Sequence, residues 1–187
     1  MRAFLALTLP KRERTRIHRS ARALRERELP VQWVDPENYH VTLKFLGSLR
    51  EERVAAVKGV MTEVAESTPP FIATIGSFGA FPTIRRPDVL WVRIEASPEL
   101  RCLKQDLEWG LAGHDFPRET RAFHPHVRLG RASADVGAGV FRGLDDVVAN
   151  LDHDGRFNVR SIDLLKTRRT PEGVRYSAVE SVRLRGD

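Results

Sequence analysis

Hydrophobic positions along the chain follow two periods, and each change of period marks a boundary between elements. Where apolar residues form short runs or alternate with polar ones, strands are predicted at 3–9, 32–34, 39–46, 71–78, 89–95, 157–166 and 174–184. Where apolar residues recur every three or four positions, helices are predicted at 11–28, 50–66, 98–112 and, weakly, 139–150. A turn at 170–173 joins the last two strands into a hairpin.

The order of these elements indicates the fold class. Strands alternate with helices, but neighbouring strands also pair as hairpins, which favours an α+β fold with mixed or mainly antiparallel sheets over a doubly wound parallel sheet. No segment is of low complexity, and no linker is long enough to separate independent domains. Residues 1–187 are therefore expected to form a single domain.

Charge narrows the class of partner. The chain carries 31 Lys and Arg, mostly Arg, against 25 Asp and Glu, for a net charge of +6. This balance suits a polyanion, because guanidinium groups match phosphate oxygens. The basic faces of helix 11–28 have two interpretations, a solvated surface or one that attracts phosphate, and the sequence leaves both open.

Cysteine content and hydropathy set further expectations. The single cysteine, Cys102, excludes a disulfide framework within the chain and any Cys-based metal site, and it is expected to pack inside helix 98–112. This cysteine usage fits a reducing cytoplasm. No stretch approaches the ~20 apolar residues of a membrane span, so no membrane partner is expected.

Two tetrads, 86 residues apart, carry the candidate chemistry: HVTL at 40–43 and HVRL at 126–129. HVTL lies at the start of the predicted strand 39–46, and HVRL lies at the start of a further strand that the stretch 123–131 predicts. In a strand, residues two apart point to the same face, so each histidine should share a face with the residue two positions on, while the apolar pair between them packs behind. A lone strand histidine is usually structural or merely exposed, but the repetition of the tetrad indicates function.

Placed side by side, the two strands would bring two imidazoles into one cleft. His40 and His126 could then act as acid and base in phosphoryl transfer, because the pKa of histidine lies near neutral pH. Thr42 and Arg128 would hold the phosphoryl oxygens. A metal-dependent phosphoesterase is the weaker alternative, because neither histidine has carboxylates at ligand spacing and Asp35 belongs to a turn.

Longer stretches around both tetrads resemble a known family, the two-histidine (2H) phosphoesterase superfamily. Within it, the chain looks like the RNA 2′,3′-cyclic phosphodiesterases, also called 2′-5′ RNA ligases or LigT-like proteins. The resemblance covers nearly the whole chain and is carried by RAFLALTLP at 2–10, WVDPENYHVTLKFLG at 33–47, FHPHVRLGR at 123–131 and the pattern LLKT…GVRY at 164–176.

The resemblance implies a fold and an activity. The expected fold is bilobal, with two pseudo-symmetric lobes of mainly antiparallel sheet, helices outside and a central cleft, and it needs no metal or cofactor. The expected activity opens an RNA 2′,3′-cyclic phosphate end to a 2′-phosphate, with possible reverse 2′-5′ ligation. RNA with cyclic phosphate ends is the expected partner and a monomer the expected state. The alternative is an RNA-end-binding protein with little turnover.

The resemblance also implies roles for individual residues. The catalytic pair falls on His40 and His126, with His126 expected as the base toward water and His40 as the acid, while Thr42 binds phosphate. Arg131 stands where the family commonly has an arginine, five residues after the second histidine.

At position 128 the chain departs from the family, which has threonine where this chain has arginine. Arg128 can still donate to a phosphate, either in the cleft or after turning outward to solvent. His124 occupies a variable position and is the weaker candidate of the two histidines in 123–131.

Overall fold

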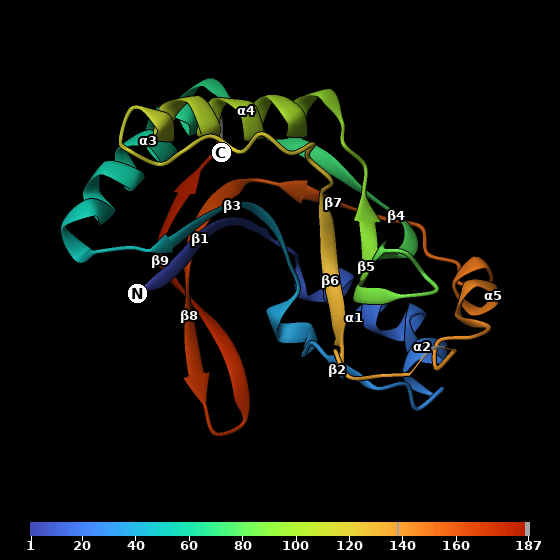
Figure 1. Ribbon diagram of the computed structural model, residues 1–187. Coiled ribbons are helices and arrows are strands. Elements are labelled where there is room, and N and C mark those ends of the chain that lie inside the picture. The colour runs from blue at the N-terminus through green and yellow to red at the C-terminus, as the bar shows by residue number, and fades with distance from the viewer. Residues whose placement is uncertain (138, 186–187) are drawn as a thin grey trace.

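The computed structural model describes residues 1–137 and 139–185 and contains one curled, fully antiparallel sheet (Figure 1). Its strands run in the order β7-β4-β5-β6-β3-β1-β8-β9, and β2 pairs with β6 beside this path. The strands are β1 (Arg2–Thr8), β2 (Val31–Trp33), β3 (His40–Ser48), β4 (Phe71–Pro82), β5 (Pro87–Ile94), β6 (His126–Ala132), β7 (Gly155–Val159), β8 (Ser161–Thr170) and β9 (Gly173–Arg183).

The helices lie outside the sheet. They are α1 (Lys11–Ser20), α2 (Arg22–Arg25), α3 (Val54–Ser67), α4 (Pro98–Ala112) and α5 (Leu144–Ala149), with 3-10 turns η1 (Pro36–Asn38) and η2 (Glu51–Arg53). The start of α4 follows directly from the sequence, because Ser97 caps it by accepting a hydrogen bond from the Leu100 amide and Pro98 occupies the first turn.

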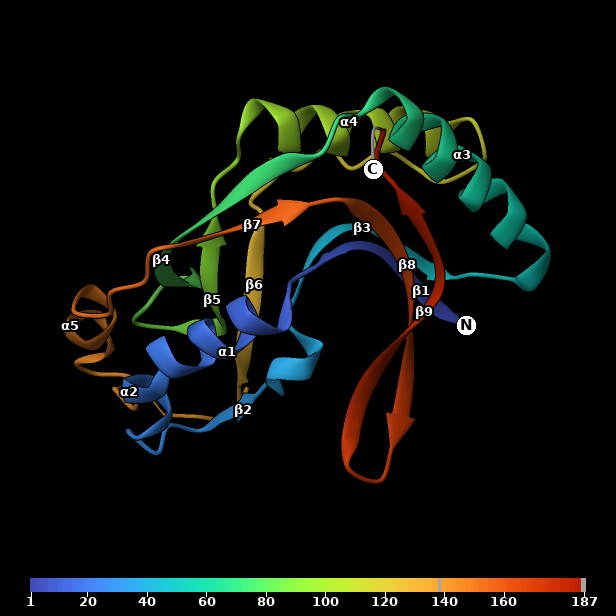
Figure 2. The same cartoon turned by 180° about the vertical axis from the view of Figure 1, so that it is seen from behind.

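The sheet divides into two lobes that meet at the β3–β6 pair, where Val41 lies opposite Val127. The first lobe contains β3, β1, β8 and β9, and the second contains β6, β5, β4 and β7. Helices α3 and α4 cover the first lobe, and α1, α2 and α5 cover the second (Figures 1 and 2). The fold is therefore α+β, mainly antiparallel and bilobal, as predicted.

The lobes are interlocked by their connections. Helix α1 directly follows β1 of the first lobe, yet it packs against β7 of the second. Helix α4 joins two strands of the second lobe, yet it packs against β3 of the first. The main core lies between sheet and helices, and a smaller cluster of Phe4, Ala6 and Leu165, with Tyr176 packed on it, lies on the opposite, concave face.

Several predicted boundaries are wrong. Helix 11–28 is interrupted at Ala21, which is buried, so that α1 and α2 replace one continuous helix. The strand predicted at 157–166 is two strands, because around Arg160 the chain passes from pairing with β4 to pairing with β1, and the core-facing positions shift from 157 and 159 to 162 and 164. Gly47 does not end β3 but lies inside it at φ +69°, and β4 runs on to Pro82.

Cys102 is exposed, which corrects the prediction that it packs in the core. The buried face of α4 consists of Leu100, Leu103, Lys104, Leu107, Glu108 and Leu111. Position 102 falls on the other side of the helix. The buried face includes the charged residues Lys104 and Glu108, which the apolar pattern did not indicate.

Candidate active site

The two tetrads occupy equivalent places at the start of the central strands. In β3, His40 and Thr42 lie half-buried on the concave face, while Val41 is fully buried behind them. In β6, His126 and Arg128 lie half-buried on the same face. Because β3 and β6 are antiparallel and adjacent, the two histidines share one cleft.

A β-bulge falls on the last residue of each tetrad. Leu43 of β3 has no partner in the register with β1, which passes from Thr42 directly to Lys44. Leu129 of β6 likewise has none in the register with β5, which passes from Arg128 to Gly130. An extra residue reverses the alternation of the positions after it.

The bulges explain which later residues reach the concave face. Phe45 pairs with Phe4 in β1, and Arg131 pairs with Val89 in β5, so both return to the face of the histidines although they stand five positions after them. Simple alternation would have sent Arg131 to the opposite face. Phe45 and Arg131 are therefore equivalent positions of the two lobes, one aromatic and 68% exposed, the other cationic and exposed.

Each imidazole is oriented by a backbone carbonyl. The Nδ1 atom of His40 lies 2.7 Å from the Asn38 carbonyl oxygen, and Nδ1 of His126 lies 2.7 Å from that of His124. A carbonyl only accepts, so Nδ1 donates in both rings and Nε2 carries the lone pair of the neutral form. Both histidines thus offer the same nitrogen for proton transfer.

Aromatic rings surround the pair. The His40 ring lies 4.9 Å from Phe4 and 5.0 Å from Tyr176, centroid to centroid, and the His126 ring lies 5.2 Å from Phe81. The sequence stretches at 2–10 and 164–176 contain Phe4 and Tyr176 but did not single them out, and Phe81 fell in a predicted loop. These rings restrict the imidazoles and remove water from them.

Burial changes the acidity of both histidines. It is the largest cause that lowers the pKa of His40 from 6.5 to about 4; the bond to the Asn38 carbonyl opposes it, and the charges of Arg128 and His126 lower the pKa further. Burial also lowers the pKa of His126, again opposed by its carbonyl bond and assisted by Arg128. Both rings are therefore neutral at pH 7 in the free protein.

The predicted phosphate-binding residues lie around the histidines. The Thr42 hydroxyl is 3.0 Å from Nε2 of His40, to which it donates when the ring is neutral. Arg128 points across the cleft, with Nη2 3.4 Å from the Tyr176 hydroxyl of the other lobe, rather than outward to solvent. Arg128, Arg131 and Tyr176 also line an adjoining groove of about 630 Å³.

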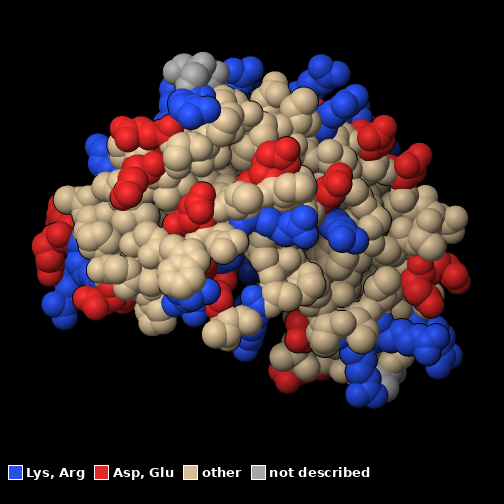
Figure 3. Space-filling model, turned by 90° about the horizontal axis from the view of Figure 1, so that it is seen from above, with Lys and Arg blue, Asp and Glu red and all other residues tan. Residues whose placement is uncertain are grey.

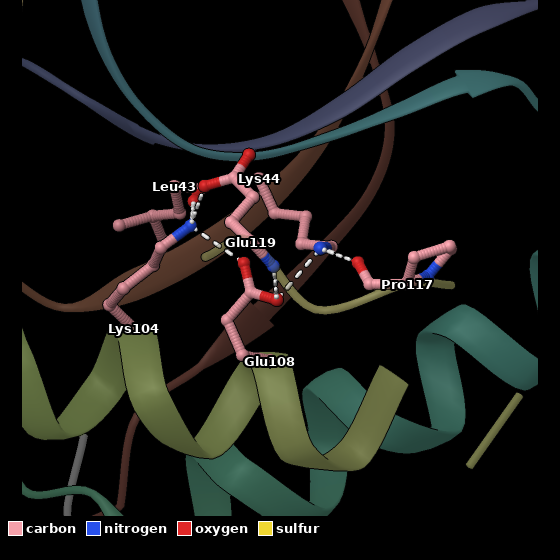
Figure 4. A network of polar contacts seen from close by, with 6 residues as sticks. All are labelled: Leu43, Lys44, Lys104, Glu108, Pro117 and Glu119. Carbon is pink, nitrogen blue, oxygen red and sulfur yellow. Dashed lines mark hydrogen bonds and ion pairs between the residues drawn. The ribbon is translucent and has the colours of Figure 1, made fainter. Parts of the chain in front are cut away.

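A buried ionic network, which the sequence analysis missed, lies behind the first histidine motif (Figure 4). Nζ of Lys44 is 2.7 Å from Glu108, and Nζ of Lys104 is 2.7 Å from Glu108, 2.6 Å from Glu119 and 2.6 Å from the carbonyl oxygen of the bulged Leu43. Burial raises the pKa of Glu108, but its hydrogen bonds from Lys104, Lys44 and the Glu119 amide outweigh this and lower it. The network joins α4 to the bulge that follows His40.

The remaining histidine of the second motif lies outside the pair. The His124 side chain is exposed, and its residue contributes a backbone carbonyl to His126. Over residues 1–137 and 139–185, no group of three or more His, Cys, Asp or Glu side chains is placed to hold a metal ion, and no helix is long and apolar enough to cross a membrane.

Several known proteins are similar to this chain in sequence and in fold. An RNA 2′,3′-cyclic phosphodiesterase of Methanothermobacter thermautotrophicus is 29% identical over 98% of this chain and 99% of its own, and one of Aeropyrum pernix is 32% identical over 75% and 76%. A crystal structure from Thermus thermophilus covers 100% of both chains at 26% identity with a TM-score of 0.82. E. coli LigT with bound 3′-AMP covers 98% of this chain and 97% of its own, at 25% identity and a TM-score of 0.77.

The model of one family matches the chain itself over residues 13–171, a span that includes both histidine motifs and both bulges. That family is described as the 2′-5′ RNA ligase superfamily. With the shared fold, this match shows that the chain belongs to the 2′-5′ RNA ligase superfamily.

Proposed function

We propose that residues 1–187 act as one metal-independent RNA 2′,3′-cyclic phosphodiesterase, which opens the cyclic end to a 2′-phosphate. The observation that carries the proposal is the matched geometry of His40 and His126. Both start a central strand, donate Nδ1 to a carbonyl two residues earlier at 2.7 Å, and present Nε2. Paired imidazoles of this kind supply both proton transfers that the reaction needs. Several relatives are named for this activity.

The proposed reaction moves two protons. One neutral imidazole takes a proton from water as its oxygen forms a bond to phosphorus, and the other ring, protonated, gives a proton to the 3′ oxygen as the P–O3′ bond breaks. We assign the base to His126, because its hydrogen bond to the His124 carbonyl is exposed and water can reach this histidine. The acid is then His40. When a 5′-hydroxyl attacks in place of water, the two roles stay the same and a 2′-5′ linkage forms. By microscopic reversibility they exchange when the 3′-hydroxyl attacks that linkage, closes the cyclic phosphate and expels the 5′ oxygen.

The acid role places a condition on His40. With a pKa of about 4 in the free protein, His40 is almost wholly neutral at pH 7. The bound phosphodiester anion must therefore raise this pKa, as an adjacent negative charge does for an imidazolium. Thr42, Arg128 and Arg131 are proposed to bind the phosphoryl oxygens and hold the anion beside both rings.

The proposal is tested by incubating the protein with a cyclic-ended oligonucleotide in EDTA and identifying the product end. Conversion to a 2′-phosphate in the presence of the chelator is expected. A 3′-phosphate product would mean that the P–O2′ bond breaks instead. Loss of activity in EDTA with recovery on adding a divalent ion would overturn the two-histidine mechanism, and binding without turnover would favour an RNA-end-binding protein.

A further inference from the structure

The groove beside the histidines is lined by arginines from three separate elements. Arg128 and Arg131 come from β6, and Arg169 and Arg175 come from the β8–β9 hairpin, which projects from the first lobe (Figure 1). Trp33 of β2 also lines it. Arg128 belongs both to this groove and to the surroundings of the two histidines, so the groove is continuous with the catalytic face.

Most of these arginines lack a counter-charge. Arg175 forms an ion pair with Asp35 at 3.2 Å. Among the described residues, Arg128, Arg131 and Arg169 have no carboxylate within ion-pair distance, although Glu172 lies in the same groove. Guanidinium groups that line one groove without a counter-charge favour a ligand that carries several phosphates.

Charge is distributed differently on another face of the molecule. On the face seen from above Figure 1, Lys and Arg are interspersed with Asp and Glu (Figure 3). In helix α1, Arg14 and Arg16 already pair with Glu37 and Glu13. Helices α1 and α2 also keep cations, such as Arg12 and Arg19, that no carboxylate of the described residues pairs with, so the position of the groove beside the histidines, and not charge alone, favours it as a phosphate-binding surface.

The hairpin is anchored where it can hold a ligand against β6. The Asn38 side-chain amide donates to the Val174 carbonyl at 2.8 Å, and the Arg175–Asp35 pair makes a second link to the same segment before β3. In the hairpin register, Arg169 lies opposite Val174, two pairs beyond the Thr167–Tyr176 pair and therefore on the same face of the hairpin as that pair. Arg169 thus lines the groove at a point farther along the hairpin than Tyr176, which contacts His40.

We propose that this groove binds the RNA strand on the 5′ side of the cyclic end, with Arg169 contacting a phosphodiester upstream of the reacting one. The inference rests on the proposed function and adds to it the site for the rest of the substrate. Because a 2′,3′-cyclic phosphate closes the 3′ terminus of an RNA, all remaining nucleotides must leave the cleft in a single direction. The groove of about 630 Å³ has the volume of a site for a small ligand, enough for the first nucleotides of that strand.

The neighbouring residue, Arg168, provides a matched control for Arg169. Arg168 is exposed, stands on the same hairpin and carries the same charge, but it does not line the groove. Replacing Arg168 or Arg169 by alanine therefore lowers the net charge equally. Only Arg169→Ala removes a groove contact.

The test measures binding by fluorescence anisotropy with a labelled trinucleotide ending in a 2′-phosphate, and kinetics with a cyclic-ended trinucleotide and a cyclic mononucleotide. Arg169→Ala is expected to weaken trinucleotide binding and raise its KM about 5- to 10-fold at low salt, less at high salt, with the mononucleotide KM unchanged. Arg168→Ala should change each value by less than about twofold.

Equal effects of the two variants, or an equal effect of Arg169→Ala on both substrates, would overturn the proposal that the groove binds the RNA strand. Failure of the proposed function looks different, because the wild-type protein would then hydrolyse neither cyclic substrate. The trinucleotide binding difference between Arg169→Ala and Arg168→Ala would still decide whether the groove holds RNA.

Discussion

The two histidine half-sites have the same backbone but different supports. In both, the histidine motif ends on a bulged leucine. Its carbonyl oxygen needs a hydrogen-bond donor from outside the strand pair in which the bulge occurs, β3–β1 or β6–β5. In the second lobe the Val34 amide, at the end of β2, donates to Leu129 at 2.8 Å. In the first lobe Nζ of Lys104 donates to Leu43 at 2.6 Å. A backbone amide and a buried ammonium satisfy equivalent carbonyls.

The residue after each bulge fits its support. Lys44 extends into the buried network, whereas Gly130 lies under β2, where an added Cβ would come within 2.5 Å of Val31 and 2.9 Å of Trp33. One half-site is therefore held by paired charges and the other by close packing of a third strand. Either support can hold the same catalytic geometry, and removing one should change stability and local exchange differently from removing the other.

Breaking either histidine should have the largest effect. His40→Ala and His126→Ala are each expected to lower kcat by at least about 10²-fold with little change in substrate binding, because each removes one proton transfer. Single-turnover kinetics on a cyclic-ended RNA would measure both. His124→Ala is the control within the second motif, since it leaves the backbone carbonyl that orients His126. Loss of activity in His124→Ala equal to that in His126→Ala would show that the wrong histidine was chosen.

The next largest effect is expected from breaking the ionic network that supports the first half-site. Lys104→Met removes the donor to Leu43 and leaves a buried carboxylate with one partner fewer, so the free energy of unfolding should fall by about 3–5 kcal/mol. Urea denaturation would measure this. Lys58→Met, which breaks the exposed pair with Glu180, should cost at most about 1 kcal/mol. Similar losses in both variants would show that the network gives no special support to the first half-site.

Breaking the packed support should cost less. Gly130→Ala forces its methyl group against Val31 and Trp33, which we expect to destabilise the protein by about 1–3 kcal/mol and to loosen β2. Hydrogen exchange should show faster exchange of the Val34 amide, with the amides of β1 unaffected. Unchanged exchange at Val34 would mean that the close approach does not hold the second half-site.

Arg128→Thr makes the second motif like the first and should have the smallest effect. We expect substantial remaining activity and a KM raised about 3- to 10-fold through a lost charged hydrogen bond. Because the Arg128 charge lowers the pKa of both histidines, its removal should raise both, and the bell-shaped profile of kcat/KM should move to higher pH. In the wild type both limbs should lie below pH 6.5, the lower near pH 4.

Arg131→Ala is the control for this shift, since Arg131 shares the face but not the causes that lower these pKa values. Its KM should rise without movement of the profile. An Arg128→Thr profile identical to that of the wild type would show that Arg128 does not act on the imidazoles.

Sequence reasoning predicted what depends on local periodicity. The fold class, helix 98–112 with its Ser97 cap, and the shared face of His40 and Thr42 follow from alternation and capping. The position of the Phe81 ring and the buried pair of Lys104 with Glu108 could not be predicted. Charged residues on a helix normally indicate a solvated face, and a phenylalanine directly before a proline outside a predicted strand normally indicates a loop. Their positions depend on contacts between segments far apart in the chain.

The bulges show the same limit most clearly. Leu43 and Leu129 look like ordinary inward-facing strand residues, and alternation alone would put Arg131 on the wrong face. Only pairing with a specific neighbour shows that one residue is extra. Once the resemblance to the family supplied Arg131, the bulge explained how it reaches the site.

The division of labour between the half-sites is tested most directly with a substrate whose 3′ bridging oxygen is replaced by sulfur. A thiolate leaves without a proton, so the variant that lacks the acid should recover its rate on this substrate and the variant that lacks the base should not. We expect kcat of His40→Ala to approach that of the wild type, while His126→Ala stays slower by about 10²-fold or more. Equal recovery of both variants, or recovery of neither, would contradict separate acid and base roles, and recovery of His126→Ala alone would contradict their assignment.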